Sequence, residues 1–277
     1  MQKKFELFRL SLVGRPQRDF IADGLGKDVS KEDYIRQVFS TKHVVQHRGI
    51  DLHYVPFDEK IIDPKFLGGR VGRPFSNIEH TPPELGLHEA LHQGWKALTI
   101  LVDPAHHDDG QKVAVEVNKA VGSSYAIINS LIERINSYSN SIYIVNCHPI
   151  IDASTFWSFA NENKGQITSL SFDFAVPNMF GGHDSIQEEL RKFRDIEKAQ
   201  DVSVKLKSAD GINTDTDKIK EAVNYVEKGG GDIVAKTKSR RTYDSKNRVK
   251  ITHITIEDSD SDIVPSILRE ASNILRS

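Results

Sequence analysis

Two histidines four residues apart, with a glutamate beside the first, are the residues of this 277-residue sequence whose types and spacing best match a catalytic chemistry. On a helix, His88 and His92 would share a face and could bind one zinc ion, with Glu89 as general base on a zinc-bound water. Such a site needs a third protein ligand. Glu116 falls on an expected strand and Glu133 on the polar face of an expected helix, so neither is convincing. We therefore interpret the string as a surface helix, with zinc as the alternative cofactor.

The string His88-Glu89-Ala90-Leu91-His92 resembles the H-E-x-x-H motif of the zincin metallopeptidases, which would imply a zinc-dependent hydrolase. It differs from that family at Ala90, where zincins usually carry a bulky apolar residue, and at Gly94, where the expected helix ends. Leu87, Leu91 and Trp95 instead explain the segment as the buried stripe of an amphipathic helix, with both histidines at its margin.

Two acids on adjacent expected strands offer a further alternative, a metal-dependent nuclease. Asp103 ends one strand and Glu116 lies on the next, which resembles the PD-(D/E)xK nucleases, where such acids hold magnesium. In that family a lysine follows the second acid by two residues. Here Asn118 stands at that position, and Lys119 falls on the opposite side of the strand. We therefore prefer a hairpin loop rich in turn residues.

The single cysteine, Cys147, is followed directly by His148. Neighbouring residues of a strand point to opposite faces, so His148 is poorly placed to activate the thiol, and we expect a buried free cysteine. One cysteine excludes an intramolecular disulfide and fits a reducing compartment. Because no apolar stretch is long enough for a membrane span, we expect a cytoplasmic protein without a membrane partner.

Positive charge is concentrated near the C-terminus, in an expected hairpin over residues 232–257 with its turn near Asp244-Ser245. Seven basic residues fall within fifteen positions, and Tyr243 lies near the expected tip; the seven are Lys236, Lys238, Arg240, Arg241, Lys246, Arg248 and Lys250. A basic ribbon with an aromatic residue can bind nucleic-acid phosphates. The chain's net charge is −2, so this contact would be local. The alternative is a solvated hairpin whose lysines protect an edge strand.

Hydrophobic periodicity and turn residues predict the elements of the fold. Expected helices cover 31–40, 81–94, 123–138, 154–163, 185–200, 216–228 and 263–276. Expected strands cover 8–12, a hairpin at 43–55 turning near Arg48-Gly49, and 98–102, 112–117, 142–147, 167–176, 202–207, 233–238 and 249–256.

The alternation of these elements predicts an α+β fold, a mixed and largely antiparallel sheet with covering helices, divisible into two subdomains. Residues 1–80 would form an N-terminal strand, helix and hairpin region that ends in a loop rich in glycine and arginine, at Gly68 to Pro74. Residues 81–277 would form the main α+β domain.

The order of elements resembles that of the RexA-like prophage-exclusion proteins and related bacterial phage-defence accessory proteins. The resemblance rests on a strand ending at Asp103-Pro104, a polar loop, the alternating strand 112–117, and the strand 171–177 that leads toward a helix. It implies a phage-defence protein that binds DNA or another protein as a dimer. It carries over no functional residue.

From the residues, we expect an intracellular, non-enzymatic binding protein without a cofactor, because the basic segment is clustered and no catalytic set is complete. The expected partners are DNA or RNA, another protein, or a second copy of the chain. The alternatives are a zinc-dependent hydrolase that uses His88, Glu89 and His92, and a metal-dependent nuclease.

Overall fold

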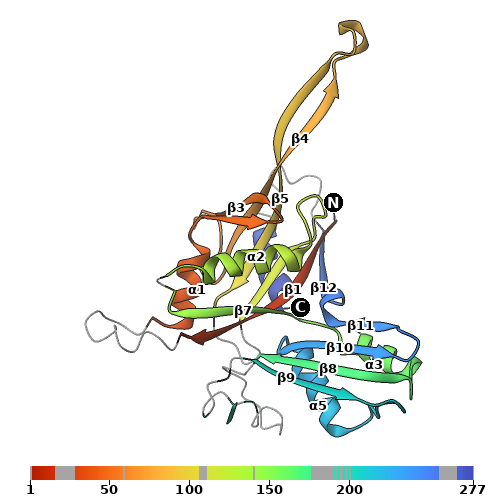
Figure 1. The fold of residues 1–277 in the computed structure, drawn as a ribbon. Coiled ribbons are helices and arrows are strands. Elements are labelled where there is room, and N and C mark those ends of the chain that lie inside the picture. Colours follow the sequence, from red (N-terminus) through yellow and green to blue (C-terminus); the bar gives the residue numbers. More distant parts are fainter. Residues whose placement is uncertain are drawn as a thin grey trace.

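The computed structural model describes residues 2–15, 29–58, 60–105, 111–139, 141–175, 190, 192–193, 196, 199, 201–255 and 267–276. Two antiparallel sheets, one of eight strands and one of four, form the framework of this part of the chain (Figure 1). The predicted α+β class is confirmed in its coarse form, although strands outweigh helices.

The larger sheet has the order β12-β1-β6-β5-β4-β3-β2, and β7 pairs with the far half of β1. Its strands are β1 (Gln2–Gly14), β2 (His43–His47), β3 (Ile50–Pro56), β4 (Leu67–His80), β5 (Glu89–Asp103), β6 (Gln111–Glu116), β7 (Tyr143–Pro149) and β12 (Ile251–Thr255). β1 is central to this sheet, which explains why its middle is buried on both faces.

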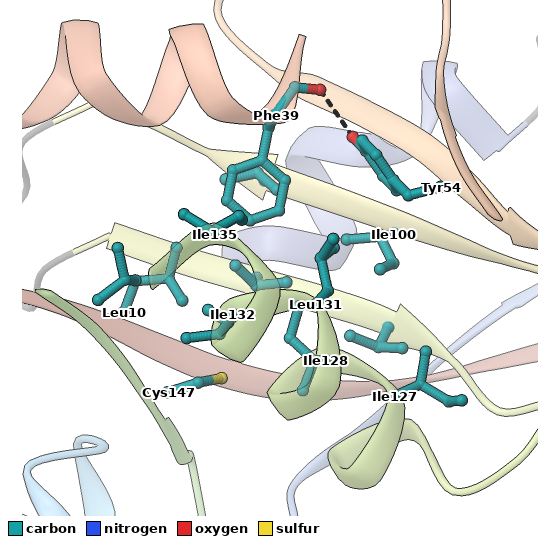
Figure 2. Close-up of a cluster of buried hydrophobic side chains, with 14 of the residues drawn as sticks. Leu10, Phe39, Tyr54, Ile100, Ile127, Ile128, Leu131, Ile132, Ile135 and Cys147 are labelled. Atoms are coloured by element: carbon teal, nitrogen blue, oxygen red, sulfur yellow. Dashed lines mark hydrogen bonds between the residues drawn. The ribbon is translucent and has the colours of Figure 1, made fainter. Parts of the chain in front are cut away.

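Helices α1 (Lys31–Phe39) and α2 (Ser124–Asn136) contribute to the main core of the larger sheet. The Ser30 side chain accepts a hydrogen bond from the backbone N–H of Asp33 and so caps α1. The isoleucines and leucine of α2 follow the helical period and are all buried: Ile127, Ile128, Leu131, Ile132 and Ile135. Figure 2 shows them packed beneath Phe39 and Tyr54, whose hydroxyl donates to the Phe39 carbonyl. The short helix α7 (Ala271–Arg276) covers the opposite face.

The smaller sheet has the order β11-β10-β8-β9. Its strands are β8 (Ile167–Ala175), β9 (Asp201–Lys207), β10 (Gly231–Thr237) and β11 (Thr242–Asp244). Helices α3 (Ala153–Glu162) and α5 (Asp217–Glu227) share a hydrophobic core with one face of this sheet. Apart from β11, these elements correspond to predicted segments, as do the β2–β3 hairpin, β6, β7 and the part of β5 from Leu98 to Val102.

Strands β4 and β5 are much longer than their neighbours. β3 pairs with β4 only as far as Gly72, and β6 pairs with β5 from Ile100 onward. In the described structure the rest of the β4–β5 ladder has no third strand, and it projects from the body as a two-stranded arm (Figure 1). The boundary expected between residues 80 and 81 falls at the tip of this hairpin, whose two strands belong to one sheet.

The predicted loop at Gly68 to Pro74 is wrong, because these residues lie in β4. The glycines serve close packing instead. A Cβ on Gly69 would lie 2.7 Å from the Tyr54 ring, and one on Gly68 would lie 2.9 Å from the Ile100 carbonyl. Glycine within a strand often marks such a close approach of side chain or backbone.

The predicted helix 81–94 is also wrong. Only Pro83–Leu85 forms a single 3₁₀ turn, and β5 begins at Glu89. A spacing of four residues fits one helix face, but it is also an even number and so fits one strand face. Leu91 and Trp95 therefore satisfy either pattern, and fourteen residue pairs between β4 and β5 decide in favour of the strand.

The predicted C-terminal hairpin 232–257 does not form. β10 pairs with β11 and β8, whereas β12 pairs with β1 in the larger sheet. The chain turns at residues 238–241, and the predicted turn residue Ser245 begins a 3₁₀ helix, Ser245–Asn247. The predicted helix 185–200 lies largely outside the described residues, as does the start of the predicted helix 263–276. No helix among the described residues is long and apolar enough to cross a membrane.

Candidate nucleic-acid interface

Among the described residues, no helix covers one face of the smaller sheet. Leu170, Phe172 and Ile233 point into the core shared with α3 and α5. Side chains alternate along a strand, so Ser169 and Ser171, which flank Leu170, must point to the other side. We call that side of the sheet the open face.

Three lysines lie on the open face. Ser169 pairs with Lys207 on β9 and with Lys236 on β10, while Ser171 pairs with Lys205. Residues that pair across a sheet share a face. Adjacent strands are about 4.8 Å apart, so Lys207 and Lys236 project from backbones roughly 10 Å apart. All three lysines are exposed.

The β10–β11 turn adds two more positive charges at the same end of the sheet. Lys238 follows β10 and its N–H donates to the Gln166 carbonyl, and Arg240 adopts a left-handed backbone with φ of 64°. Neither side chain, nor any of the three lysines, has an ion pair with another described residue. We call this group the basic end: Lys205, Lys207, Lys236, Lys238 and Arg240.

The other predicted binding residues do not join the basic end. Arg241 pairs with Glu162 of α3 at 3.0 Å. Lys246 lies 3.5 Å from the buried carboxylate of Asp232. Burial lowers the pKa of Lys246, but the charges of Asp232, Tyr125 and Asp244 and the hydrogen bond to Asp232 together outweigh it, so the pKa is raised. Two further basic residues are exposed in the segment that leads to β12, namely Arg248 and Lys250.

Tyr243 is not at a hairpin tip. Its side chain is only 3% exposed and packs against Phe156 and Phe159. Its hydroxyl lies 2.9 Å from that of Thr155, and burial raises the pKa of the phenol. Tyr243 therefore belongs to the core of the smaller sheet and presents no ring to a ligand.

Lys205 and Lys207 were missed by the sequence reasoning. The signal was present, because Ser203, Lys205 and Lys207 alternate with Val202, Val204 and Leu206 along the predicted strand. That alternation identifies a polar face carrying two lysines. Only the pairing through β8 places that face beside Lys236, a contact between segments about thirty positions apart that no local pattern specifies.

The opposite end of the open face is acidic and borders a cleft of about 450 Å³. Asp173, Asp201 and Asp232 line it together with His148 and Lys246. The Nδ1 of His148 lies 3.7 Å from Asp232, which is too far for a hydrogen bond, and neither ring nitrogen has a hydrogen-bond partner in the described structure. Charge on the open face therefore changes from positive to negative toward this cleft.

The structure separates the residues of the zincin-like string. His88 lies near the tip of the arm and His92 within β5. Four residues of extended chain span about 13 Å, against about 6 Å along a helix. His92 lies 3.6 Å from Glu79 across the ladder. No group of three histidine, cysteine or acidic residues that could hold a metal occurs among the described residues.

The two acids of the nuclease alternative are also apart. Asp103 lies opposite Lys112 in the strand register, at one end of the β5–β6 ladder. Glu116 lies at the other end, where it forms an ion pair with Lys3 and accepts a hydrogen bond from the Thr99 N–H. An antiparallel hairpin places these two positions at opposite ends of the ladder, so they do not converge on one metal.

Cys147 is buried as predicted, and burial raises the pKa of its thiol. A thiol held in the protonated form is a poor nucleophile.

Comparison with known proteins finds no protein family that matches this sequence, and neither the curated proteins nor the solved structures give a significant match.

Proposed function

We propose that this chain is a nucleic-acid-binding protein whose basic end contacts the phosphate backbone. The observation that carries the proposal is the row Lys207, Ser169 and Lys236 on a sheet face that no described helix covers, with Lys205 beside it. These lysines are exposed and lack ion pairs in the described structure, so phosphates would meet charges that are not already neutralised. Binding then gains from the release of counterions.

The chemistry of the open face favours binding that is independent of sequence. Lysine acts as a flexible point charge rather than a planar fork that reads base edges. The described positions of the open face hold serine, threonine, valine, aspartate and lysine, with no aromatic ring on which a base could stack. Contacts of this kind position the nucleic-acid backbone and carry little sequence information.

The acidic end of the open face limits where a nucleic-acid strand can bind. Phosphates are repelled from the carboxylates of Asp173, Asp201 and Asp232, and the nucleic acid is expected to cross the sheet near the β10–β11 turn. The biological role we propose is that of an accessory factor in phage defence, and the order of elements that resembles phage-exclusion proteins supports it.

The first prediction concerns the lysines of the open face. Replacing Lys205, Lys207 and Lys236 by glutamine should weaken binding of a fluorescein-labelled oligonucleotide by roughly tenfold or more at low salt. The slope of the logarithm of affinity against the logarithm of salt concentration should become shallower by about 2 for single-stranded and about 3 for duplex nucleic acid. The reason is that binding releases fewer counterions when three phosphate contacts are lost. Fluorescence anisotropy over about 50 to 200 mM salt measures both quantities.

The matched control removes the same charge from the opposite side of the sheet. Lys218, Lys220 and Lys228 lie on α5 or at its C-terminal end, and their replacement by glutamine should leave the affinity within about twofold, because exposed charges away from the contact are largely screened. If both triple variants bound the oligonucleotide equally weakly, the loss of affinity would reflect net charge alone and not a contact at the open face. Undiminished, salt-insensitive binding by the open-face variant would contradict the proposal.

A further inference from the structure

The projecting arm has two chemically different faces. Directly paired residues share a face, so Pro74 lies beside Trp95 and Ile78 beside Leu91. We call this side the outer face, and its residues are Pro74, Ser76, Ile78, His80, Glu89, Leu91, Gln93 and Trp95. Ile78, Leu91 and Trp95 are each more than half exposed.

The opposite face of the arm forms its own contacts. The Phe75 ring lies over Gly94, where an added Cβ would approach it to 2.8 Å. Lys96 places its ammonium 4.5 Å from the centre of the same ring, and His92 lies 3.6 Å from Glu79. This side is polar and charged, and it resembles an ordinary solvated surface.

The outer face continues onto the body of the protein. Val44 pairs with His53, and His53 pairs with Gly72, so these residues share the face that carries Trp95. The Trp95 ring lies edge-on to His53 at 5.2 Å and covers Gly72. We call the Trp95 ring together with His53 and Gly72 the Trp95 platform. Exposed Val44 and Val55 extend the apolar surface beside it.

Exposed apolar side chains are concentrated on this part of the molecule. Of the thirteen large hydrophobic side chains that are exposed among the described residues, seven lie on β2 to β5 or at the arm tip, namely Val44, Val55, Ile78, Leu85, Leu87, Leu91 and Trp95. Such a concentration of exposed apolar side chains is uncommon on monomers and marks an interaction site.

The order of residues along the outer face fits a second copy of the same face. Consider a two-fold axis placed at the level of Ser76 and Pro74, with the two arms antiparallel. Ile78 and Leu91 of one copy then lie over Gly72 and the Trp95 platform of the other. Bulky side chains meet a flat surface with a glycine at its centre, and each side contributes the same contact twice, as an isologous interface requires.

Charge supports the same arrangement. Arg70 lies at the body end of the face, and Glu89 lies ten residue pairs further along, near the tip. An antiparallel arrangement brings Arg70 of each copy opposite Glu89 of the other. Both are exposed, and neither has an ion pair with another described residue. Within one chain they are roughly 33 Å apart, too far to interact.

We propose that two copies of this chain associate through their outer faces, arm against arm and antiparallel, with reciprocal Arg70–Glu89 pairs at the ends of an apolar contact around Leu91 and Trp95. Packed sheets lie about 10 Å apart face to face, a spacing that these side chains can fill. This inference does not depend on the proposed nucleic-acid contact, which lies on the other sheet.

The reciprocal pairs allow a test by mixing, which is the second prediction. Arg70→Glu alone sets two glutamates against each other, and Glu89→Arg alone sets two arginines against each other. Each variant should therefore dimerise at least about tenfold more weakly than the wild type in sedimentation velocity. Mixed one to one, they should form a heterodimer of near wild-type affinity, because both pairs are then opposite in charge.

The control is Glu79→Arg, which reverses a charge on the other face of the arm next to Glu89 and should leave dimerisation unchanged. Circular dichroism of each variant checks that it is folded. A wild-type chain that stays monomeric at tens of micromolar would overturn the proposal, and so would single variants that do not regain association when mixed. Leu91→Glu provides an independent check, since it should abolish association without touching either charge.

Discussion

His43 links helix α1 to the segment that follows α2 through both of its ring nitrogens. The Nε2 atom lies 2.6 Å from the Val38 carbonyl and must donate to it, so in the neutral ring Nδ1 accepts from the Tyr138 hydroxyl at 2.8 Å. Burial lowers the pKa of His43 below 6.5. The Val38 hydrogen bond opposes this shift, while the Arg134 charge adds to it. The fold therefore favours the neutral imidazole.

This gives the third prediction, a loss of stability in acid. Because the folded pKa of His43 is lower than its unfolded value, the unfolded chain binds more protons as the pH falls below about 6.5. The contribution is fully present above that pH and is lost as the pH falls through the folded pKa. The free energy of unfolding, measured with urea, should change less between about pH 7.5 and pH 5.5 in His43→Gln than in the wild type. Equal changes in both proteins would show that His43 does not contribute. His47, whose pKa is also lowered by burial, should retain its share in the variant.

At the level of elements, local patterns identify most helices and strands but not the arm. The α2 helix and the β2–β3 hairpin were predictable because a buried stripe and a glycine turn are local signals. The arm was not, because Leu91 and Trp95 fit both the helical and the strand period. Likewise, the basic segment was visible as charge, but its division between two sheets depends on pairings with β1 and β8, which are distant in sequence.

The β2–β3 turn supplies the fourth prediction. Arg48 and Gly49 both have positive φ, 51° and 78°, as a type I′ turn requires. A Cβ on Gly49 would meet no atom within 4 Å, so Gly49→Ala should cost only the backbone strain, about 1 kcal/mol. Arg48→Asn should stabilise by roughly 0.5 kcal/mol, since asparagine tolerates this conformation better. Urea unfolding measures both changes; opposite signs would show that the turn type differs.

The whole molecule separates a packed body from an arm that adds nothing to its core. The three hydrophobic clusters have no buried member between Val71 and Leu98. The arm's sequence is therefore free of the requirement to stabilise the body. Its apolar outer face is better explained by association than by folding, and a dimer formed there would carry two basic ends.

The fifth prediction follows from that arrangement. Replacing residues 74–95 by Asn-Gly, which joins the paired residues Arg73 and Lys96 through a two-residue turn, should leave a folded chain with a melting temperature within a few degrees of the wild type. It should be monomeric and should bind an oligonucleotide of about 10 nucleotides with unchanged affinity, because one basic end suffices for that length. A strand several times longer should bind about tenfold or more weakly than it binds the wild type, since only a dimer can engage it twice at millimolar effective concentration. Sedimentation velocity and anisotropy measure these quantities.

Weaker binding of the short oligonucleotide by the armless variant would place part of the nucleic-acid contact on the arm. If the armless variant and the wild type bound the long oligonucleotide equally well, the two basic ends of a dimer could not reach the same molecule.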